Sequence, residues 1–249
     1  MTLDLHLVCD VGQLICGRGT KGQVMTKKMP PAVRDRAWEI AHHEMGHYAV
    51  ARALGFATGS VSLTVTMDLR HHGGASISLV RAISSIDAMK QHLEARMMVL
   101  LAGAMAQTLG ARHPGGQRVD KSKATAILKG EQGAEQDYAK IRELQHLLRN
   151  IVYPDTDAAS SERISTELKT LTDRAWQRTQ DIVEELSGTI AELAAALVDG
   201  MAIVEQWGRA ADTYEVMLAG QMLERLRAVQ AIPSIGVGGP EKSGRVFDR

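Results

Sequence analysis

The stretch His43-Glu44-Met45-Gly46-His47 has the pattern His-Glu-x-x-His, within a segment from Trp38 to Leu54 whose composition is typical of a helix. On a helix, residues four positions apart lie on the same face, so the two histidines can bind one metal ion together. Glu44 lies close enough to accept a proton from a metal-activated water. The motif predicts a Zn²⁺ site with His43 and His47 as ligands and Glu44 as the general base. The competing interpretation is a surface helix with two unrelated histidines.

Composition limits the classes of function. The chain has 249 residues, enough for one large domain or two small ones, and its 45% apolar and 23% charged content is ordinary for a soluble globular protein. The formal net charge is zero, which removes any general argument for a nucleic acid or an anionic membrane as the partner. Aromatic residues make up only 4%, so stacking platforms for single-stranded nucleic acid are not expected.

The cysteines and the N-terminus indicate the compartment. Cys9 and Cys16 do not have a zinc or redox spacing, and a reduced pair is favoured over a disulfide because nothing points to export. The first residues include an acid and no basic lead-in, unlike a signal peptide. The longest apolar run, Met97 to Ala106, is far shorter than the roughly 18 residues of a membrane span. We expect a soluble, cytoplasmic protein without a membrane span.

Glycine-rich stretches near both ends resemble phosphate-binding loops, but neither has the residues that such a loop requires. Gly17 to Gly22 is followed by Gln23-Val24 and not by Lys-Ser or Lys-Thr. In Gly236 to Ser243, Glu241 stands where a phosphate loop needs glycine, and too few residues follow for a helix. The chain is divided into an N-terminal extension with short strands (1–32), one main domain (33–230) and a flexible C-terminal tail (231–249).

A helix and a hairpin are predicted around the motif. Pro30-Pro31 opens the helix and Gly55 ends it. Ser60–Thr66 and Ala75–Leu79 alternate polar and apolar residues, which predicts two strands joined by a turn at Asp68–Gly74. An exposed strand edge here could bind an extended peptide. His71-His72 falls in the turn and is interpreted as exposed polar loop, with a substrate-side or second metal role as the alternative.

The rest of the chain is predicted to be helical. A methionine-rich helix follows from Ser84 or Ser85 to Gly110, with its methionines in the core. A long loop, 110–132, carries a short helix at Ala124–Leu128. Apolar spacing of three, four and seven predicts later helices at 133–150, 161–200 and 210–229. The fold class is therefore mostly α with a small β-sheet (α+β).

A carboxylate should complete the metal site, since catalytic zinc keeps three protein ligands and one open position. Asp137, Glu131, Glu135 and Glu94 are the candidates. The order of the motif, the hairpin, Leu100–Leu109, Gly133-Ala-Glu-Gln-Asp137 and a long helix resembles the peptidase domain of FtsH-type zinc proteases over residues 36–200. The resemblance implies an FtsH-peptidase-like helical zincin domain, with His43, His47 and Asp137 as zinc ligands and Glu44 as the base.

The chain also departs from that family. Ala102-Gly103-Ala104 replaces a usual Gly-Gly-Arg, Gln107-Thr108 replaces a pair of acids, and Gln136 replaces an asparagine before the aspartate. These changes affect residues that orient metal ligands. FtsH proteins also carry a membrane anchor and an ATPase, and neither is visible here. Self-association and a separate ATPase partner both stay open.

The expected function is that of a zinc metalloendopeptidase that hydrolyses unfolded proteins or flexible peptides through a zinc-activated water. The alternative is a non-catalytic, peptidase-like binding module that recruits a protein partner. Fold resemblance alone cannot separate these two, because function depends on the site. The intact His43, Glu44 and His47 favour the enzyme.

Overall fold

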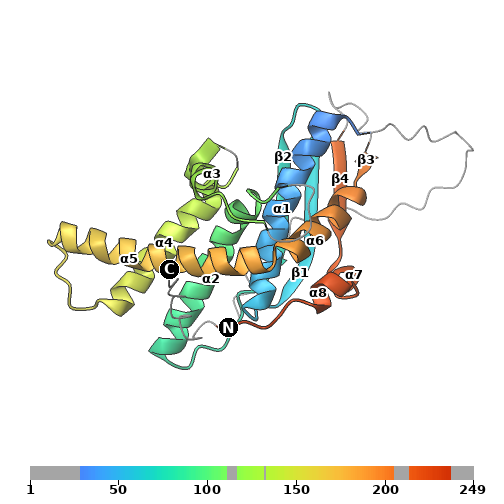
Figure 1. Ribbon diagram of the computed structural model, residues 1–249. Helices are drawn as coiled ribbons and strands as arrows, with labels where there is room; N and C mark the ends of the chain where they lie inside the picture. The colour runs from blue at the N-terminus through green and yellow to red at the C-terminus, as the bar shows by residue number, and fades with distance from the viewer. Residues whose placement is uncertain (1–28, 111–116, 132, 205–212, 237–249) are drawn as a thin grey trace, which may run out of the picture.

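The computed structural model describes residues 29–110, 117–131, 133–204 and 213–236, together with all their side chains except that of Glu131. Helices predominate, and one small antiparallel sheet accompanies them, which confirms the expected α+β class (Figure 1). The elements are α1 (Pro31–Ala53), β1 (Thr58–Thr66), β2 (His71–Ile77), α2 (Ile86–Ala106), α3 (Lys121–Ala126), α4 (Glu135–Val152), α5 (Ser161–Glu185), α6 (Ser187–Asp199), β3 (Ala202–Val204), β4 (Thr213–Leu218), α7 (Gly220–Leu223) and α8 (Arg227–Gln230).

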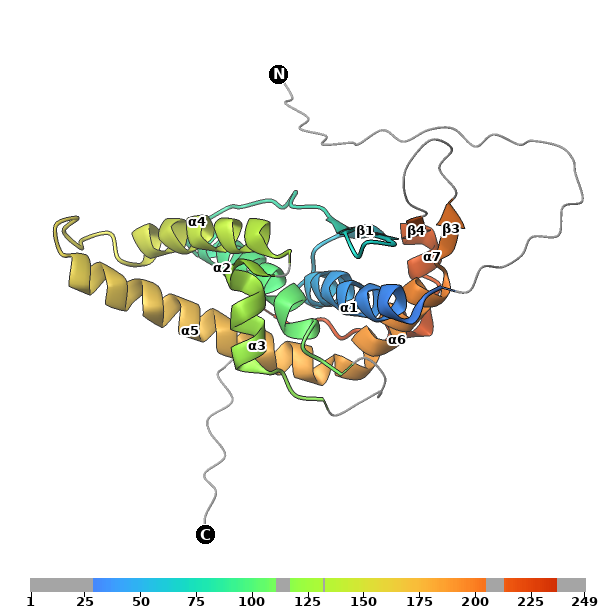
Figure 2. The ribbon, with the colours of Figure 1, turned by 90° about the horizontal axis from the view of Figure 1, so that it is seen from above.

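The motif helix forms as predicted. Pro31 occupies the first turn of α1, where its missing N–H is no loss, and Gly55 follows the helix with φ 78°. The N–H of Phe56 donates to the carbonyl of Ala51, which closes the end of the helix. From Ile40 to Ala51 every residue of α1 is buried. In Figure 2 the sheet lies on one side of α1 and α6 on the other, so this helix runs through the middle of the fold.

The sheet has the order β2-β1-β4-β3, with every neighbouring pair antiparallel. Val61, Leu63 and Val65 of β1 are buried and alternate with less buried residues, as the sequence predicted for this strand. Burying each of these side chains contributes about 1.5–3 kcal/mol. Among the described strands β2 pairs only with β1, so its other side is an edge of the sheet. Helix α1 contacts β2.

The predicted turn of the hairpin is too long. A tight reversal over Met67–Arg70, with Leu69 at φ 66°, lets β2 begin at His71. His71 and His72 therefore pair with Val65 and Thr64 of β1 and do not lie in a loop. Gly73 and Gly74, which suggested a turn, are instead strand residues.

Two of the predicted helices are wrong in part. The segment 161–200 divides at Leu186 into α5 and α6, where the pair Ser187-Gly188 favours a kink over a continuous helix. The predicted helix 210–229 contains β4, in which the β-branched and aromatic residues Thr213, Tyr214 and Val216 suit a strand. Two short helices, α7 and α8, follow β4. The short helix of the loop begins at Lys121, earlier than predicted, because Asp120 caps it by accepting from the N–H of Lys123.

Helix α2 packs against α1, α4 and α5. Met97, Met98 and Met105 of α2 are fully buried, which confirms the expected methionine-rich core. Helices α4 and α5 extend away from the sheet (Figure 1) and are joined by a buried ion pair between Arg149 and Glu167. None of the described helices is both long and apolar enough to cross a membrane. The expected N-terminal strands, both cysteines and most of each glycine-rich stretch lie outside the described residues.

Candidate metal centre

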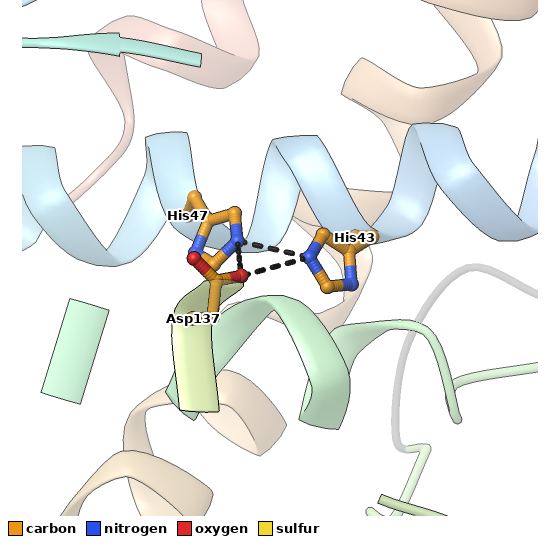
Figure 3. Close-up of side chains that lie close together, drawn as sticks. All are labelled: His43, His47 and Asp137. Carbon is orange, nitrogen blue, oxygen red and sulfur yellow. Dashed lines mark hydrogen bonds and ion pairs between the residues drawn. The ribbon is translucent and has the colours of Figure 1, made fainter. Parts of the chain in front are cut away.

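Three side chains from two helices meet at one point (Figure 3). His43 and His47 lie on successive turns of α1, and Asp137 lies in the first turn of α4. Oδ2 of Asp137 is 3.3 Å from Nε2 of His43 and 3.0 Å from Nε2 of His47. The two Nε2 atoms are themselves 3.0 Å apart. These atoms form a group that could hold a metal ion.

The other nitrogen of each ring is held by a fixed acceptor. Nδ1 of His43 lies 3.0 Å from Oε1 of Gln107, and Nδ1 of His47 lies 2.7 Å from the carbonyl oxygen of Val99. A carbonyl oxygen can only accept, so the Nδ1 atom of His47 carries a hydrogen. The Nε2 atom of a neutral ring then presents a lone pair. Metal-binding histidines have the same pattern of one coordinating and one donating nitrogen.

The charges at the site depend on one another. The pKa of Asp137 is lowered, because hydrogen bonds and positive charge from His43 and His47 outweigh the burial that would raise it. Burial opposes the charged form of His47, yet the hydrogen bond and charge of Asp137, together with the charge of Glu44, raise the pKa of His47. Two nitrogen lone pairs and a carboxylate this close repel one another unless a cation lies among them. A proton on His47 is one such cation, and a metal ion is the other.

Helix α2 approaches the two histidines very closely at Gly103. A Cβ atom at this position would lie 2.4 Å from Nε2 of His47 and 2.7 Å from Nε2 of His43. Any side chain there would clash with both imidazole rings, so this close approach of α2 to the two histidines requires glycine at position 103.

Glu44 lies beside the group without belonging to it. Its side chain is buried and packs against Gly73 of β2, where a Cβ atom would lie only 2.6 Å from Oε1. Glu44 borders the same cleft as the histidines. A carboxylate fixed next to a metal centre, and not used as a ligand, can act as a base toward a water molecule there.

A cleft of about 450 Å³ opens over His43, His47 and Asp137. This hollow, called the cleft below, lies between α1, β2, the middle of α2 and the start of α4. It is lined by Ile40, His43, Glu44, His47, His71, His72, Gly73, Gly74, Ala75, Ile77, Arg96, Leu100, Gly133, Glu135, Gln136, Asp137 and Lys140. The edge strand β2 thus forms one wall along most of its length. His71 and His72 face a candidate site and not an open turn.

The other carboxylates considered as the third metal ligand do not contact the two histidines in the described structure. Glu135 lines the cleft but is not part of the group that could hold a metal. Glu94 lies within ion-pair distance of Arg174 and Arg178, both of α5. The side chain of Glu131 lies outside the described residues. Among the carboxylates that the structure describes, Asp137 alone joins the two histidines.

Several residues of the site could not be assigned from the motif. Gln107 was noted only as a departure from the family pattern, and its bond to His43 depends on how α1 and α2 pack. Arg36 donates to Nδ1 of His71 across 3.2 Å, and both burial and the charge of Arg36 lower the pKa of His71. No spacing in the sequence connects residues so far apart in the chain.

No protein-family model matches this chain, and a comparison with curated proteins finds no match.

Proposed function

We propose that the protein is a zinc metalloendopeptidase with an FtsH-peptidase-like fold that hydrolyses unfolded proteins or flexible peptides. The observation that carries the proposal is the meeting of His43, His47 and Asp137, with Glu44 buried beside them. The order of the motif helix, the paired strands, α2 and the helix of Asp137 also agrees with what the resemblance implies.

The ligand atoms suit zinc. Four ligands about 2.0–2.1 Å from a tetrahedral Zn²⁺ lie about 3.3 Å from one another. The three separations here are 3.0, 3.0 and 3.3 Å, so one ion can contact all three atoms after a small adjustment. Two imidazoles and one carboxylate leave the fourth position for water, as in catalytic zinc sites. The same donor set also suits Fe²⁺, and Glu44 is what favours hydrolysis over redox chemistry.

Glu44 provides the proton transfers of the reaction. Bound zinc supplies positive charge that polarises a carbonyl group and acidifies water. Glu44 accepts one proton from the water molecule while the oxygen of that water adds to the carbonyl carbon of the peptide bond. The carbon–nitrogen bond then breaks, and Glu44 returns the proton to the departing nitrogen. One water is consumed, and one carboxyl group and one amine are formed.

The free edge of β2 supports an extended substrate. Gly73, Gly74 and Ala75 line the cleft and carry small side chains or none, so a peptide backbone can approach the strand. Main-chain hydrogen bonds to an edge strand require an unfolded segment. A folded protein offers one only on opening, which costs up to its global stability of roughly 5–15 kcal/mol. The described residues contain no phosphate-binding loop that would couple ATP to that opening.

The experiment compares unfolded casein with a stable folded protein, each incubated with the purified chain with and without ATP. Slow cleavage of casein alone is expected, independent of ATP, abolished by a zinc chelator and restored by added zinc. Asp137→Ala should lose both zinc and cleavage. Efficient digestion of the folded protein, or stimulation by ATP, would contradict this account of substrate delivery. Fully bound zinc without any cleavage would favour a binding module that recruits a protein partner.

A further inference from the structure

Arg96 is a cation in the cleft that forms no ion pair with the part of the chain that the structure describes. It lies on α2, is partly buried and lines the cleft together with the metal ligands. Its guanidinium makes no hydrogen bond or ion pair with any described residue. Other arginines of this part of the chain do have such bonds: Arg36 with Glu39, Arg52 with Glu224 and Arg149 with Glu167.

Burial makes this position costly for a charge. Loss of water lowers the pKa of Arg96, and the nearby charge of Asp137 only partly offsets that effect. No ion pair joins Arg96 to Asp137, whose Oδ2 atom contacts both histidines. A partly buried, unpaired cation in a cleft is typical of a binding site for an anion.

The position of Arg96 on α2 sets its distance from the metal centre. Arg96, Leu100 and Gly103 are spaced by four and three residues and share one face of the helix. Gly103 lies against the histidine nitrogens. Seven residues of helix correspond to about 10 Å along the axis. An extended peptide advances about 3.4 Å per residue, so this separation along the helix corresponds to two or three peptide residues.

Two basic side chains of the cleft, Arg96 and Lys140, can pair with a substrate carboxylate, although Glu44, Glu135 and Asp137 line the same cleft. Lys140 follows Asp137 by one helical turn, lines the same cleft and is exposed, so it adds a second positive charge at the rim. Arginine binds carboxylates with two parallel hydrogen bonds, which gives it selectivity for a planar anion. A peptide offers this group either as an Asp or Glu side chain or as its C-terminal carboxylate.

We propose that Arg96 is a specificity-determining residue, which binds a substrate carboxylate two or three residues from the cleaved peptide bond. The proposal rests on the peptidase function proposed above. It adds a preference for acidic over neutral sequence on one side of the cleaved bond, and Lys140 strengthens that preference at the mouth of the cleft.

The experiment uses a series of fluorogenic peptides built of Ala and Gly, each with a single Glu at a different position. Each Glu peptide is compared with a matched peptide that has Gln at the same position. Each is made with a free and with an amidated C-terminus, so that side-chain and terminal carboxylates are distinguished. The zinc-loaded wild type should cleave the best Glu peptide about tenfold or more faster in kcat/KM than its Gln partner, mainly through KM. Arg96→Gln should abolish that ratio while the zinc content stays at the wild-type level. Arg96→Glu should reverse the preference toward a Lys peptide.

Binding is measured as well, so that the result does not depend on turnover. Anisotropy of the same peptides on zinc-loaded Glu44→Gln protein should show the same Glu-over-Gln preference, and its loss when Arg96→Gln is added. If the wild type cleaves no peptide but this preference in binding is present, the peptidase proposal fails and the carboxylate site stands. Equal binding of Glu, Gln and amidated peptides overturns the carboxylate site. An Arg96→Gln protein that loses zinc and slows on both peptides equally also overturns it, because Arg96 would then act through Asp137.

Discussion

Gln107 and His43 are joined across the interface of α1 and α2, with Oε1 of the glutamine 3.0 Å from Nδ1 of the histidine. Gln107 is buried, at 3% exposure, so no water replaces it easily. This bond fixes the orientation of the ring and leaves Nε2 to face Asp137. Gln107 thus provides an acceptor for the Nδ1 atom of His43, as metal-binding histidines in other proteins usually have.

Replacing Gln107 with leucine should weaken metal binding without unfolding the protein. The side chain keeps its approximate volume but loses the oxygen that accepts from His43. We expect a loss of about 10–100-fold in metal affinity, measured by competition with a chromogenic chelator. Gln107→Glu, which restores an acceptor, should bind metal at least as tightly as the wild type. Gln91→Leu on the exposed side of α2 is the control, and an equal loss there would remove any special role for Gln107.

Gly103→Ala tests the close approach of α2. The added methyl group would lie 2.4 Å from Nε2 of His47, within the space that the ligand atoms share. We expect the variant to retain its helical circular dichroism, because alanine favours helices. Its metal content should fall to less than about a tenth of the wild-type content, since a tenfold loss of affinity requires only about 1.4 kcal/mol. Full metal content in this variant would show that the histidines point elsewhere.

Metal affinity should depend on pH in a defined direction. The pKa of His47 is raised above its ordinary value of 6.5, so protons compete with the metal from a higher pH than at a free histidine. Asp137, whose pKa is lowered from 3.8, stays ionised throughout this range. Apparent affinity should fall about tenfold per pH unit for each displaced proton below the pKa of His47. Constant affinity from about pH 8 to about pH 6 would contradict the contact between His47 and Asp137.

The same two groups set the stability of the metal-free protein. His47 has a raised pKa, so its contribution is fully present below 6.5 and is lost as the pH rises through the folded-state value. Asp137 has a lowered pKa, so its contribution is present above 3.8 and is lost as the pH falls through the folded-state value. The free energy of unfolding is measured with urea in the presence of a chelator. The difference in this free energy between wild type and Asp137→Ala should therefore be largest between pH 3.8 and pH 6.5.

The ion pair of α4 and α5 should matter more for stability than exposed pairs. Glu167 is buried and bonded to Arg149, Arg163 and Thr156. Its pKa is lowered because these hydrogen bonds outweigh desolvation, so its contribution is lost as the pH falls below 4.5 through the folded-state value. Glu167→Gln should lower the thermal midpoint by several degrees at neutral pH. Lys169→Ala, which breaks the exposed ion pair with Asp173, is the control and should change the thermal midpoint little.

The part of the site that lies within one helix was predictable. The spacing of His43 and His47 needs only the period of α1, and the burial of that helix follows from its apolar neighbours. Asp137 is 90 residues beyond His47, and its choice among four carboxylates came from the order of motifs. Its contact with the histidines agrees with that choice, while its role as a ligand stays a prediction.

The errors arose where local pattern and tertiary pairing disagree. Glycines 73 and 74 suggested a turn, but small residues also suit a strand against which Glu44 packs. The segment that holds β4 has apolar residues at spacings that fit a helix, and pairing with β1 decides for a strand. Gln107 and Arg96 derive their surroundings from the packing of α2 on α1 and α4, which no single stretch of sequence specifies.

The central claim is that Glu44 is the base of a zinc-dependent hydrolysis whose metal is held by His43, His47 and Asp137. Its most direct test is the rate of casein cleavage by wild type and Glu44→Gln, with bound zinc measured in the same samples. Glutamine keeps the size and the contact with Gly73 but cannot accept a proton. Equal zinc, about one per chain, and a rate reduced by a factor on the order of 10² or more are predicted. Equal zinc with an unchanged rate of cleavage would contradict the account.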